Sequence, residues 1–285
     1  EVKFTRGKKM PCQSATNLPP SALTFDIFIL TIHTRNLTPS AFTFLPLTTM
    51  ASDPPFQEAY KSLIEQSIRE KKKKKTHLWE ACHPNVFIEC QLPLIDLSQL
   101  KGSLSEQERC KDQICKAARE FGFFQVVNHG VSPEILEKMR KEQVMAFKQP
   151  FDRKSREDSF LNLSAGAYRW GTPTATNLGQ LCWSEAFHIP MTDVFSASDG
   201  TYNSFSSTLK HFATTVANLA QILAEILAEK IGRKPIIFRE NCFPSSCYLR
   251  LNRYPPCPLL EEVFGLMPHT DTDFLTILHQ DQVGG

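Results

Sequence analysis

The sequence predicts a protein of the α+β class. Three observations favour this class: short apolar runs alternate with helical patterns between residues 92 and 147, a long amphipathic helix follows at about 205–231, and a strand of alternating polarity comes next. The chain has 285 residues, of which 41% are hydrophobic, so it can bury a substantial core.

The N-terminal part of the chain divides at Met50. Residues 1–49 show no sustained periodicity and contain five Pro, whereas the next segment opens with a proline pair and an amphipathic helix pattern that ends in the run Lys71–Lys75. We therefore expect residues 1–49 to be an unpacked extension, disordered or not native to the working protein, and residues 50–91 to be a helix with a basic linker. A transit peptide before Met50 and a nuclear address in the lysine run stay open as alternatives.

Regular local signals begin at residue 92 and define a region that extends to residue 204. The segment "LPLIDL" at 92–97 is typical of a short strand, and Ser105 with Glu108 predicts a capping box for the next helix. Gly122 is expected to end that helix. The helical period turns four apolar residues toward the core: Ile114, Ala117, Ala118 and Phe121.

A second strand and a second helix follow in this region. The strand is predicted in "FFQVVNHG", residues 123–130, because this segment is rich in aromatic and branched side chains. Ser132 and Pro133 suit the cap and the first turn of a helix that extends to about Phe147. From Gln149 to Ser204 the chain contains too many turn residues for another long helix.

The clearest helix is predicted from Phe205 to Ile231, at the start of the last region, residues 205–285. Its apolar residues form one stripe, which indicates core packing, and Gly232 stands at the position of a C-terminal cap. The stripe comprises Leu209, Phe212, Ala213, Val216, Leu219, Ala220, Leu223, Ile226 and Leu227.

Alternating polarity predicts a strand in "CYLRLNRYPPCP", residues 247–258. Four residues point to its polar side: Tyr248, Arg250, Asn252 and Tyr254. A polar strand face usually meets water, but a cation, an amide and a phenol at two-residue intervals could also hold a small carboxylate. The pattern leaves both interpretations open.

Charge and cysteine content exclude several classes of protein. A net charge of +2 gives no field that would attract nucleic acid or an anionic membrane, so a small molecule or a protein is the expected partner. Nine scattered Cys without a CxxC pair favour a reducing compartment over a disulfide framework or a thiolate zinc site. No apolar run approaches the roughly 20 residues that span a bilayer, and Asp26 interrupts the best signal-peptide candidate, Leu23–Ile32. We expect a cytoplasmic location, with the nucleus as the alternative.

The segment "GLMPHTDTDFLTIL", residues 265–278, contains the candidate metal ligands. On an extended chain His269 and Asp271 lie on the same side, so an imidazole nitrogen and a carboxylate oxygen can approach one ion. An isolated pair of this kind is more often a surface histidine beside a turn carboxylate. Non-haem iron sites that activate oxygen use two His and one carboxylate, so a third ligand would be required.

Four segments together resemble the plant soluble Fe(II)- and 2-oxoglutarate-dependent dioxygenases. They follow in the family's order and separation between Leu92 and Gly285: "LPLIDLSQL", "CKAAREFGFFQVVNHGVS", "YLRLNRYPPCP" and "GLMPHTDTDFLTILHQDQVGG". Within this family, "CWSEAFHIP" together with "LRLNRYPPCP" is most similar to the gibberellin 2-oxidases, in particular the branch that acts on twenty-carbon gibberellins.

The resemblance implies a fold, a reaction and roles for particular residues. An N-terminal α/β region would pack on an incomplete double-stranded β-helix, or jelly roll, that starts after the long helix. His269 and Asp271 match iron ligands, Tyr254 matches the phenol that binds the far carboxylate of 2-oxoglutarate, and Asn252 and Arg250 match polar residues of the same pocket. The reaction would be 2-beta-hydroxylation of a gibberellin with Fe(II), 2-oxoglutarate and ascorbate.

Two parts of the family's site have no counterpart in the sequence: a second iron histidine and an Arg-x-Ser pair that binds 2-oxoglutarate. His279 cannot replace that histidine, because a continuous strand would carry it about 25 Å from the metal. His129 is interpreted as a structural residue. We therefore expect a C-terminally truncated chain without turnover. Two alternatives remain: another plant specialised-metabolite hydroxylase, and a non-catalytic protein that retains a hormone- or partner-binding surface.

Overall fold

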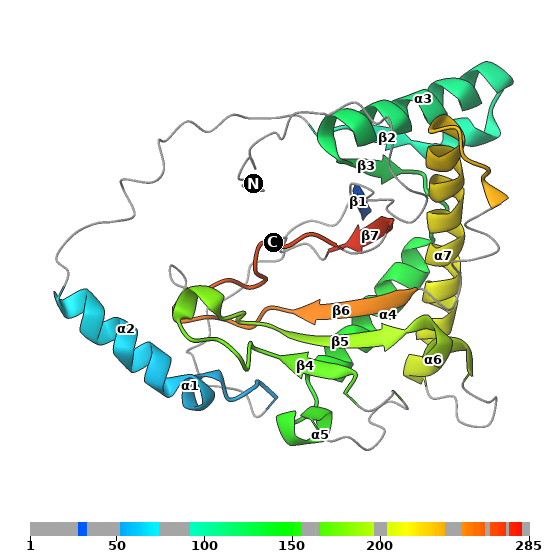
Figure 1. Cartoon of the computed structure of the whole chain (residues 1–285). Coiled ribbons are helices and arrows are strands. Elements are labelled where there is room, and N and C mark those ends of the chain that lie inside the picture. The colour runs from blue at the N-terminus through cyan, green and yellow to red at the C-terminus, as the bar shows by residue number, and fades with distance from the viewer. Residues whose placement is uncertain are drawn as a thin grey trace, which may run out of the picture.

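The structure, a computed structural model, describes residues 28–32, 52–73, 92–155, 163, 166–196, 204–236, 247–259, 263–271 and 274–280. Helices alternate with the strands of two sheets, so the predicted α+β class is confirmed. In Figure 1 the two sheets lie one above the other, and the long helix α7 (Ser204–Lys230) runs along one end of both. None of the helices in these ranges is long and apolar enough to cross a membrane.

The first sheet is parallel and has the strand order β2–β3–β1–β7. β2 (Leu94–Asp96) and β3 (Phe123–Val127) form in the two apolar runs predicted as strands, and β7 (Leu275–His279) follows the predicted metal-binding segment. Ile95 and Val126 are partners in the register and are both buried. Such branched side chains suit a parallel sheet, because both faces of these sheets are usually covered.

The strand β1 (Phe28–Ile32) differs from the expectation that residues 1–49 stay outside the core. It pairs in parallel with β3 on one side and with β7 on the other. The expectation is therefore wrong for this strand, because the short apolar run "FILTI" can add to a sheet although its surroundings lack periodicity. The other residues of that segment lie outside the described ranges.

The helix α3 (Leu104–Phe121) begins with a different capping box from the one predicted. Ser103 is the N-cap, and its backbone N–H donates to Glu106 Oε2 at 2.7 Å. The spacing S-x-x-E occurs twice here, and the earlier copy encloses the first turn. The prediction of Ser105 and Glu108 was thus wrong by two residues. Glu108 instead forms ion pairs with a lysine of the next turn and a lysine of α7.

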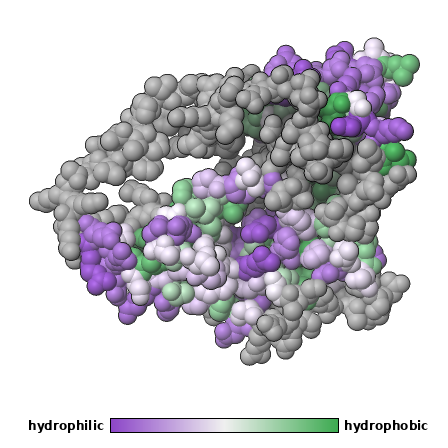
Figure 2. Space-filling model, viewed as in Figure 1, coloured by the Kyte–Doolittle hydropathy of each residue, from purple (hydrophilic) through white to green (hydrophobic). Residues whose placement is uncertain are grey.

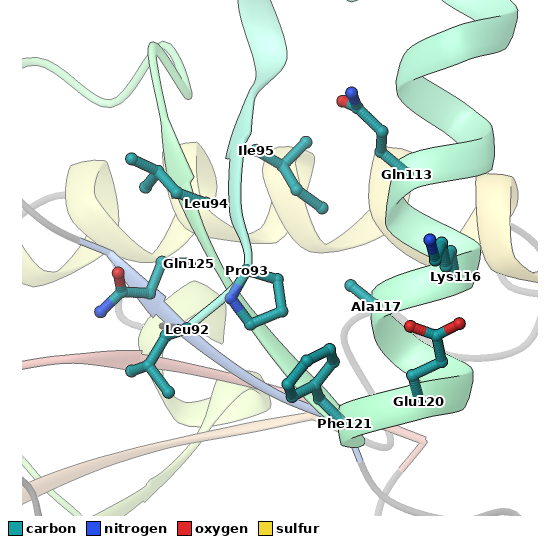
Figure 3. Close-up of a pocket in the computed structure, with 10 residues that line it drawn as sticks. All are labelled: Leu92, Pro93, Leu94, Ile95, Gln113, Lys116, Ala117, Glu120, Phe121 and Gln125. Atoms are coloured by element: carbon teal, nitrogen blue, oxygen red, sulfur yellow. The ribbon is translucent and has the colours of Figure 1, made fainter. Parts of the chain in front are cut away.

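Three of the four residues predicted to face inward from α3 are buried. Ile114, Ala117 and Ala118 are at most 5% exposed, whereas Phe121 is 40% exposed. Gly122, with φ 77°, ends the helix in the left-handed conformation as predicted. Phe121 borders an open cavity of about 910 Å³ between β2 and α3 (Figure 3). None of the predicted site residues lines this cavity, whose wall includes Leu92, Pro93, Leu94, Gln113, Lys116 and Glu120.

The helices α4 (Pro133–Phe147) and α7 form the main core together with α3 and the sheets. The Ser132 hydroxyl caps α4 by accepting a backbone N–H at 3.3 Å, with Pro133 in the first turn, as predicted. α7 starts one residue before the predicted position, and Gly232 follows its end with φ 73°. Most of the predicted stripe is buried: Leu209, Phe212, Ala213, Leu219, Leu223, Ile226 and Leu227.

The second sheet is antiparallel, with the order β4–β5–β6. β4 (Tyr168–Trp170) and β5 (Glu185–Pro190) come from the region before α7, and β6 (Tyr248–Arg253) is the predicted strand of alternating polarity. Because β5 pairs with β6 along its whole length, the regions before and after the boundary at 204/205 share one sheet.

The remaining helices are short or lie at the periphery. α1 (Phe56–Ala59) and α2 (Lys61–Lys73) follow the proline pair, where a helical pattern was predicted. Figure 2 shows a hydrophilic surface over α2, whereas α1 packs its Phe56 into a second hydrophobic cluster with β4 and the segment before β5. α5 (Phe151–Ser155) and α6 (Met191–Ser196) flank the antiparallel sheet.

Candidate metal centre

The predicted metal ligands come together just before β7. His269 Nε2 lies 3.2 Å from Asp271 Oδ1, and we refer to these two residues as the metal pair. The histidine side chain is 49% exposed and the carboxylate 18%. The metal pair is therefore accessible to a ligand from solution.

Hydrogen bonds orient both side chains of the metal pair. His269 Nδ1 lies 2.7 Å from the carbonyl oxygen of Met267. A carbonyl can only accept, so this contact is a hydrogen bond in the tautomer that carries its proton on Nδ1, and that tautomer offers the lone pair of Nε2 to a metal ion. Thr276, in β7, donates its hydroxyl to Asp271 Oδ2 at 2.8 Å. These two bonds leave Nε2 and Oδ1 facing each other.

The donor set of the metal pair fits a divalent metal ion. Two ligands at about 2.1 Å from one ion and at a right angle to each other are roughly 3 Å apart. The observed separation of 3.2 Å is close to that value. The outer nitrogen and the outer oxygen are both hydrogen-bonded, which is the arrangement that fixes the tautomer and rotation of metal ligands.

Other histidines of the described residues do not join the metal pair. Within those ranges there is no group of three His, Cys, Asp or Glu side chains that could hold a metal ion. His129 Nδ1 accepts the Val131 N–H at 3.1 Å, which agrees with its predicted structural role. Burial lowers the pKa of His129, and His279 at the end of β7 lowers it further. These two histidines thus lie near each other at the end of the first sheet.

The residues predicted to bind 2-oxoglutarate lie along β6 and just after it. Arg250 Nε donates to Asn252 Oδ1 at 2.9 Å, so the two side chains share the predicted polar face. Tyr254 is 51% exposed, and its ring packs on Gly265, where a Cβ would lie 2.8 Å from Tyr254 Cδ1. Gly265 begins the segment that carries the metal pair. Among the described residues, no hydrogen bond or ion pair joins Arg250 or Asn252 directly to the metal pair.

Comparison with known proteins identifies the family. A model of the N-terminal region of non-haem dioxygenases in morphine synthesis matches residues 92–204, and a model of the 2OG-Fe(II) oxygenase superfamily matches residues 245–285. Gibberellin 2-beta-dioxygenase 8 of Arabidopsis thaliana is 53% identical over 235 residues, which cover 82% of this chain and 68% of that protein. The chain belongs to the 2OG-Fe(II) oxygenase superfamily. The predicted resemblance to the plant enzymes is thereby confirmed.

A second gibberellin 2-beta-dioxygenase agrees with the assignment. Gibberellin 2-beta-dioxygenase 6 of Oryza sativa subsp. japonica is 39% identical, over 83% of this chain and 68% of the relative. A solved 2-oxoglutarate binary complex of the dioxygenase for auxin oxidation 1 from Arabidopsis thaliana has 27% identity and a TM-score of 0.46, and the match covers 64% of each chain. The superfamily uses Fe(II) and 2-oxoglutarate, as the sequence predicted.

The oxygenase has a histidine beside the predicted pocket that sequence reasoning did not single out. His188, in β5, is the register partner of Arg250, and its ring lies 4.4 Å from the ring of Tyr248. The alternation in "EAFHIP" could have indicated it, because Ala186, His188 and Pro190 share a strand face. The sequence alone does not tell which face of β5 lies beside Arg250, whereas the pairing of β5 with β6 does.

A buried ionic network fixes the other face of β6. Lys154, 1% exposed, donates to Glu185 Oε2 at 2.5 Å and to two backbone carbonyls. Glu185 also accepts from the Tyr168 hydroxyl and from Arg253, the residue before Tyr254. Burial lowers the pKa of Lys154, and burial together with the charge of Glu185 raises the pKa of Tyr168. The network anchors β6 on the side opposite Arg250 and Asn252.

Proposed function

We propose that this oxygenase is a gibberellin 2-oxidase, which hydroxylates a gibberellin at carbon 2 and so deactivates the hormone or its precursor. One observation carries the proposal: two oriented ligand atoms, His269 Nε2 and Asp271 Oδ1, lie 3.2 Å apart in a chain that is 53% identical to a gibberellin 2-beta-dioxygenase. The proposed substrates are twenty-carbon gibberellins, the proposed reductant is ascorbate, and the proposed location is the cytoplasm.

His269 and Asp271 are the residues that would hold Fe(II), through Nε2 and Oδ1. When bound, Fe(II) would supply a centre that activates dioxygen, which is the oxidant: one oxygen atom would go into the succinate formed by oxidative decarboxylation of 2-oxoglutarate and the other into the new hydroxyl group. The chain's own contribution is orientation. The Met267 carbonyl fixes the histidine tautomer, and the Thr276 hydroxyl fixes the rotation of the carboxylate.

Tyr254, Asn252 and Arg250 are the residues that would bind a carboxylate of 2-oxoglutarate. The guanidinium offers charge-assisted hydrogen bonds, and the phenol adds one more donor. The bond from Arg250 to Asn252, at 2.9 Å, restricts the arginine before the cosubstrate arrives. A restricted side chain loses less rotamer freedom on binding, which favours affinity.

We further propose that the antiparallel sheet β4–β5–β6 is part of an incomplete double-stranded β-helix. Its strand β6 supports this by presenting Arg250 on an exposed face and Leu251 to the core. Because β5 and β6 pair across the boundary at 204/205, the regions 92–204 and 205–285 would fold together as one unit.

Mass spectrometry of reaction products tests the proposed function. The 285-residue chain, and a fusion of it to the C-terminal part of a gibberellin 2-beta-dioxygenase, are incubated with Fe(II), 2-oxoglutarate, ascorbate and a gibberellin of twenty or nineteen carbons. A 2-hydroxylated product that disappears in the His269→Ala and Asp271→Ala variants supports the proposal. An undiminished product in both variants contradicts the ligand assignment.

Two other outcomes of the same assay identify the alternative functions. Hydroxylation of a different plant metabolite, with gibberellins left unchanged, would assign the chain to specialised metabolism. Feruloyl CoA ortho-hydroxylase 2 of Arabidopsis thaliana, 32% identical over 68% of this chain, is a relative of that kind. Saturable gibberellin binding without turnover would indicate a non-catalytic binding protein.

A further inference from the structure

A loop joins the two halves of the proposed site, and both of its ends are held by one short segment. The loop leaves β6 at Tyr254 and reaches the metal-binding segment at Gly265. The segment that holds it, Leu181–Trp183, lies directly before β5. None of these residues belongs to the proposed ligand set except Tyr254.

Three hydrogen bonds attach Leu181–Trp183 to the loop. The backbone N–H of Trp183 donates to the Phe264 carbonyl at 2.7 Å, and the Phe264 N–H donates to the Leu181 carbonyl at 3.2 Å. Together they form a parallel bridge between Cys182 and Phe264. At the other end of the loop, the indole Nε1–H of Trp183 donates to the Pro256 carbonyl at 3.2 Å. Trp183 is therefore bonded to both ends.

The surroundings of Trp183 keep it in place. Its side chain is 5% exposed, and its ring stacks on Phe56 of α1 with centroids 4.4 Å apart and planes inclined by 17°. Leu181, two residues earlier, is completely buried. A well-packed side chain in one rotamer can hold its hydrogen-bond partners at fixed positions.

The position of Phe264 determines where Gly265 meets Tyr254. The Tyr254 ring occupies the space that a side chain on residue 265 would need, since a Cβ there would lie 2.8 Å from Cδ1 and 3.3 Å from Cε1. A Cβ at residue 265 would therefore need the ring to shift. The ring would move if the loop opened or if residue 265 were larger.

We propose that Trp183 is a positioning residue that sets the place of the Tyr254 phenol relative to the metal pair and so promotes binding of 2-oxoglutarate. The identity of the cosubstrate site rests on the proposed function. The position of the tyrosine ring rests on the hydrogen bonds and the packing alone, so the two parts can be tested separately.

Substitution of Trp183 by phenylalanine tests the proposal. Trp183→Phe keeps an aromatic ring against Phe56 but removes the N–H that binds the Pro256 carbonyl. Trp170→Phe is the matched control, because Trp170 contacts the same Phe56 edge-on, with centroids 5.5 Å apart, from β4. Two readouts are used: the dissociation constant of 2-oxoglutarate, measured by calorimetry with Fe(II) under anaerobic conditions, and the fluorine resonance of Tyr254 in chains labelled with 3-fluorotyrosine.

Loss of one hydrogen bond predicts that Trp183→Phe binds 2-oxoglutarate about three- to ten-fold more weakly, while Trp170→Phe stays within about two-fold of the wild type. The Tyr254 resonance should move in Trp183→Phe and not in Trp170→Phe. Gly265→Ala, at an exposed position away from the core, should weaken 2-oxoglutarate binding and move the same resonance even if Trp183→Phe fails to fold.

Two results would overturn the proposal in distinguishable ways. If Trp183→Phe folds and its Tyr254 resonance stays where it is in Trp170→Phe, Trp183 does not position the ring. If Gly265→Ala leaves the Tyr254 resonance in place, the contact at Gly265 does not position it either. If neither the wild-type chain nor its fusion to the C-terminal part of a gibberellin 2-beta-dioxygenase binds 2-oxoglutarate while the resonance still moves in Trp183→Phe, the positioning stands, and the proposed function and the cosubstrate part of the inference fall together.

Discussion

Thr276 decides which oxygen of Asp271 remains available to a metal. Its hydroxyl donates to Oδ2 at 2.8 Å and so turns Oδ1 toward His269. We predict that Thr276→Val, which keeps the shape and removes the hydroxyl, weakens Fe(II) binding about ten-fold or more, because outer hydrogen bonds orient metal ligands. Thr276→Ser should stay near the wild type. Anaerobic titration with Fe(II) measures both, and equal affinities in all three chains would show that another contact orients the carboxylate.

His129 makes stability depend on pH in a defined direction. Burial, and secondarily His279, lowers the pKa of His129 below its ordinary value of 6.5. The unfolded chain then binds a proton at a pH where the folded chain does not, so the free energy of unfolding falls as the pH drops below about 6.5. This contribution is fully present above that value and is lost on acidification toward the folded pKa.

Replacement of His129 tests this pH dependence. Urea unfolding at about pH 7.5 and about pH 5.5 should show a smaller pH effect in His129→Gln than in the wild type. His211→Gln, at an exposed position on α7, is the control and should keep the wild-type difference. An identical pH effect in all three chains would remove His129 from the explanation.

At the scale of the element, the two serines in the copies of S-x-x-E at the start of α3 should contribute differently to the free energy of unfolding. Ser103 is the N-cap and exchanges hydrogen bonds with Glu106, whereas Ser105 lies inside the first turn. Ser103→Ala should lower the free energy of unfolding by about 1 kcal/mol, and Ser105→Ala by less than about 0.5 kcal/mol. Urea unfolding of the two variants measures both losses. A larger loss in Ser105→Ala would support Ser105 as the N-cap, as the sequence alone predicted.

Elements whose signals lie in neighbouring residues could be predicted from the sequence. α4 has its cap and first-turn proline side by side, and α7 has an unbroken stripe and a terminal glycine, so their limits were predicted to within about one residue. The box of α3 was misplaced because two copies of the same spacing compete within a few positions. Phe121 was misplaced because the last turn of α3 opens onto the cavity beside β2.

The part of the candidate site formed by neighbouring residues could be predicted from the sequence, and the part formed by distant residues could not. His269 and Asp271 are two residues apart, so strand geometry alone brings them together. Trp183 and His188 were missed because their importance arises from partners in β6 and the following loop. The Lys154–Glu185 pair joins residues 31 positions apart, and no local pattern indicates such a contact.

At the scale of the whole molecule, the pairing of β1 with β3 and β7 leads us to predict that this short N-terminal strand stabilises the first sheet. The amide protons of Ile29 to Thr31 should exchange slowly with solvent, because β3 and β7 pair with this strand on both sides. Deletion of residues 28–32 should expose two strand edges. Binding of a hydrophobic dye should then exceed the binding measured for a chain from which residues 11–15 have been deleted instead. Fast exchange at Ile29 to Thr31 would place β1 outside the sheet.

The position of β1 between β3 and β7 also constrains the order of folding. Phe28 pairs with Leu275, so one edge of β1 finds its partner only after residue 275 has been synthesised. β3 and the helices α3 and α4 have short-range contacts and can form much earlier, since pairing between distant segments is slow. During that interval the edge of the run "FILTI" that will face β7 has no strand partner on the nascent chain. The folding yield of the chain should therefore depend on chaperones that bind such apolar segments until β7 emerges.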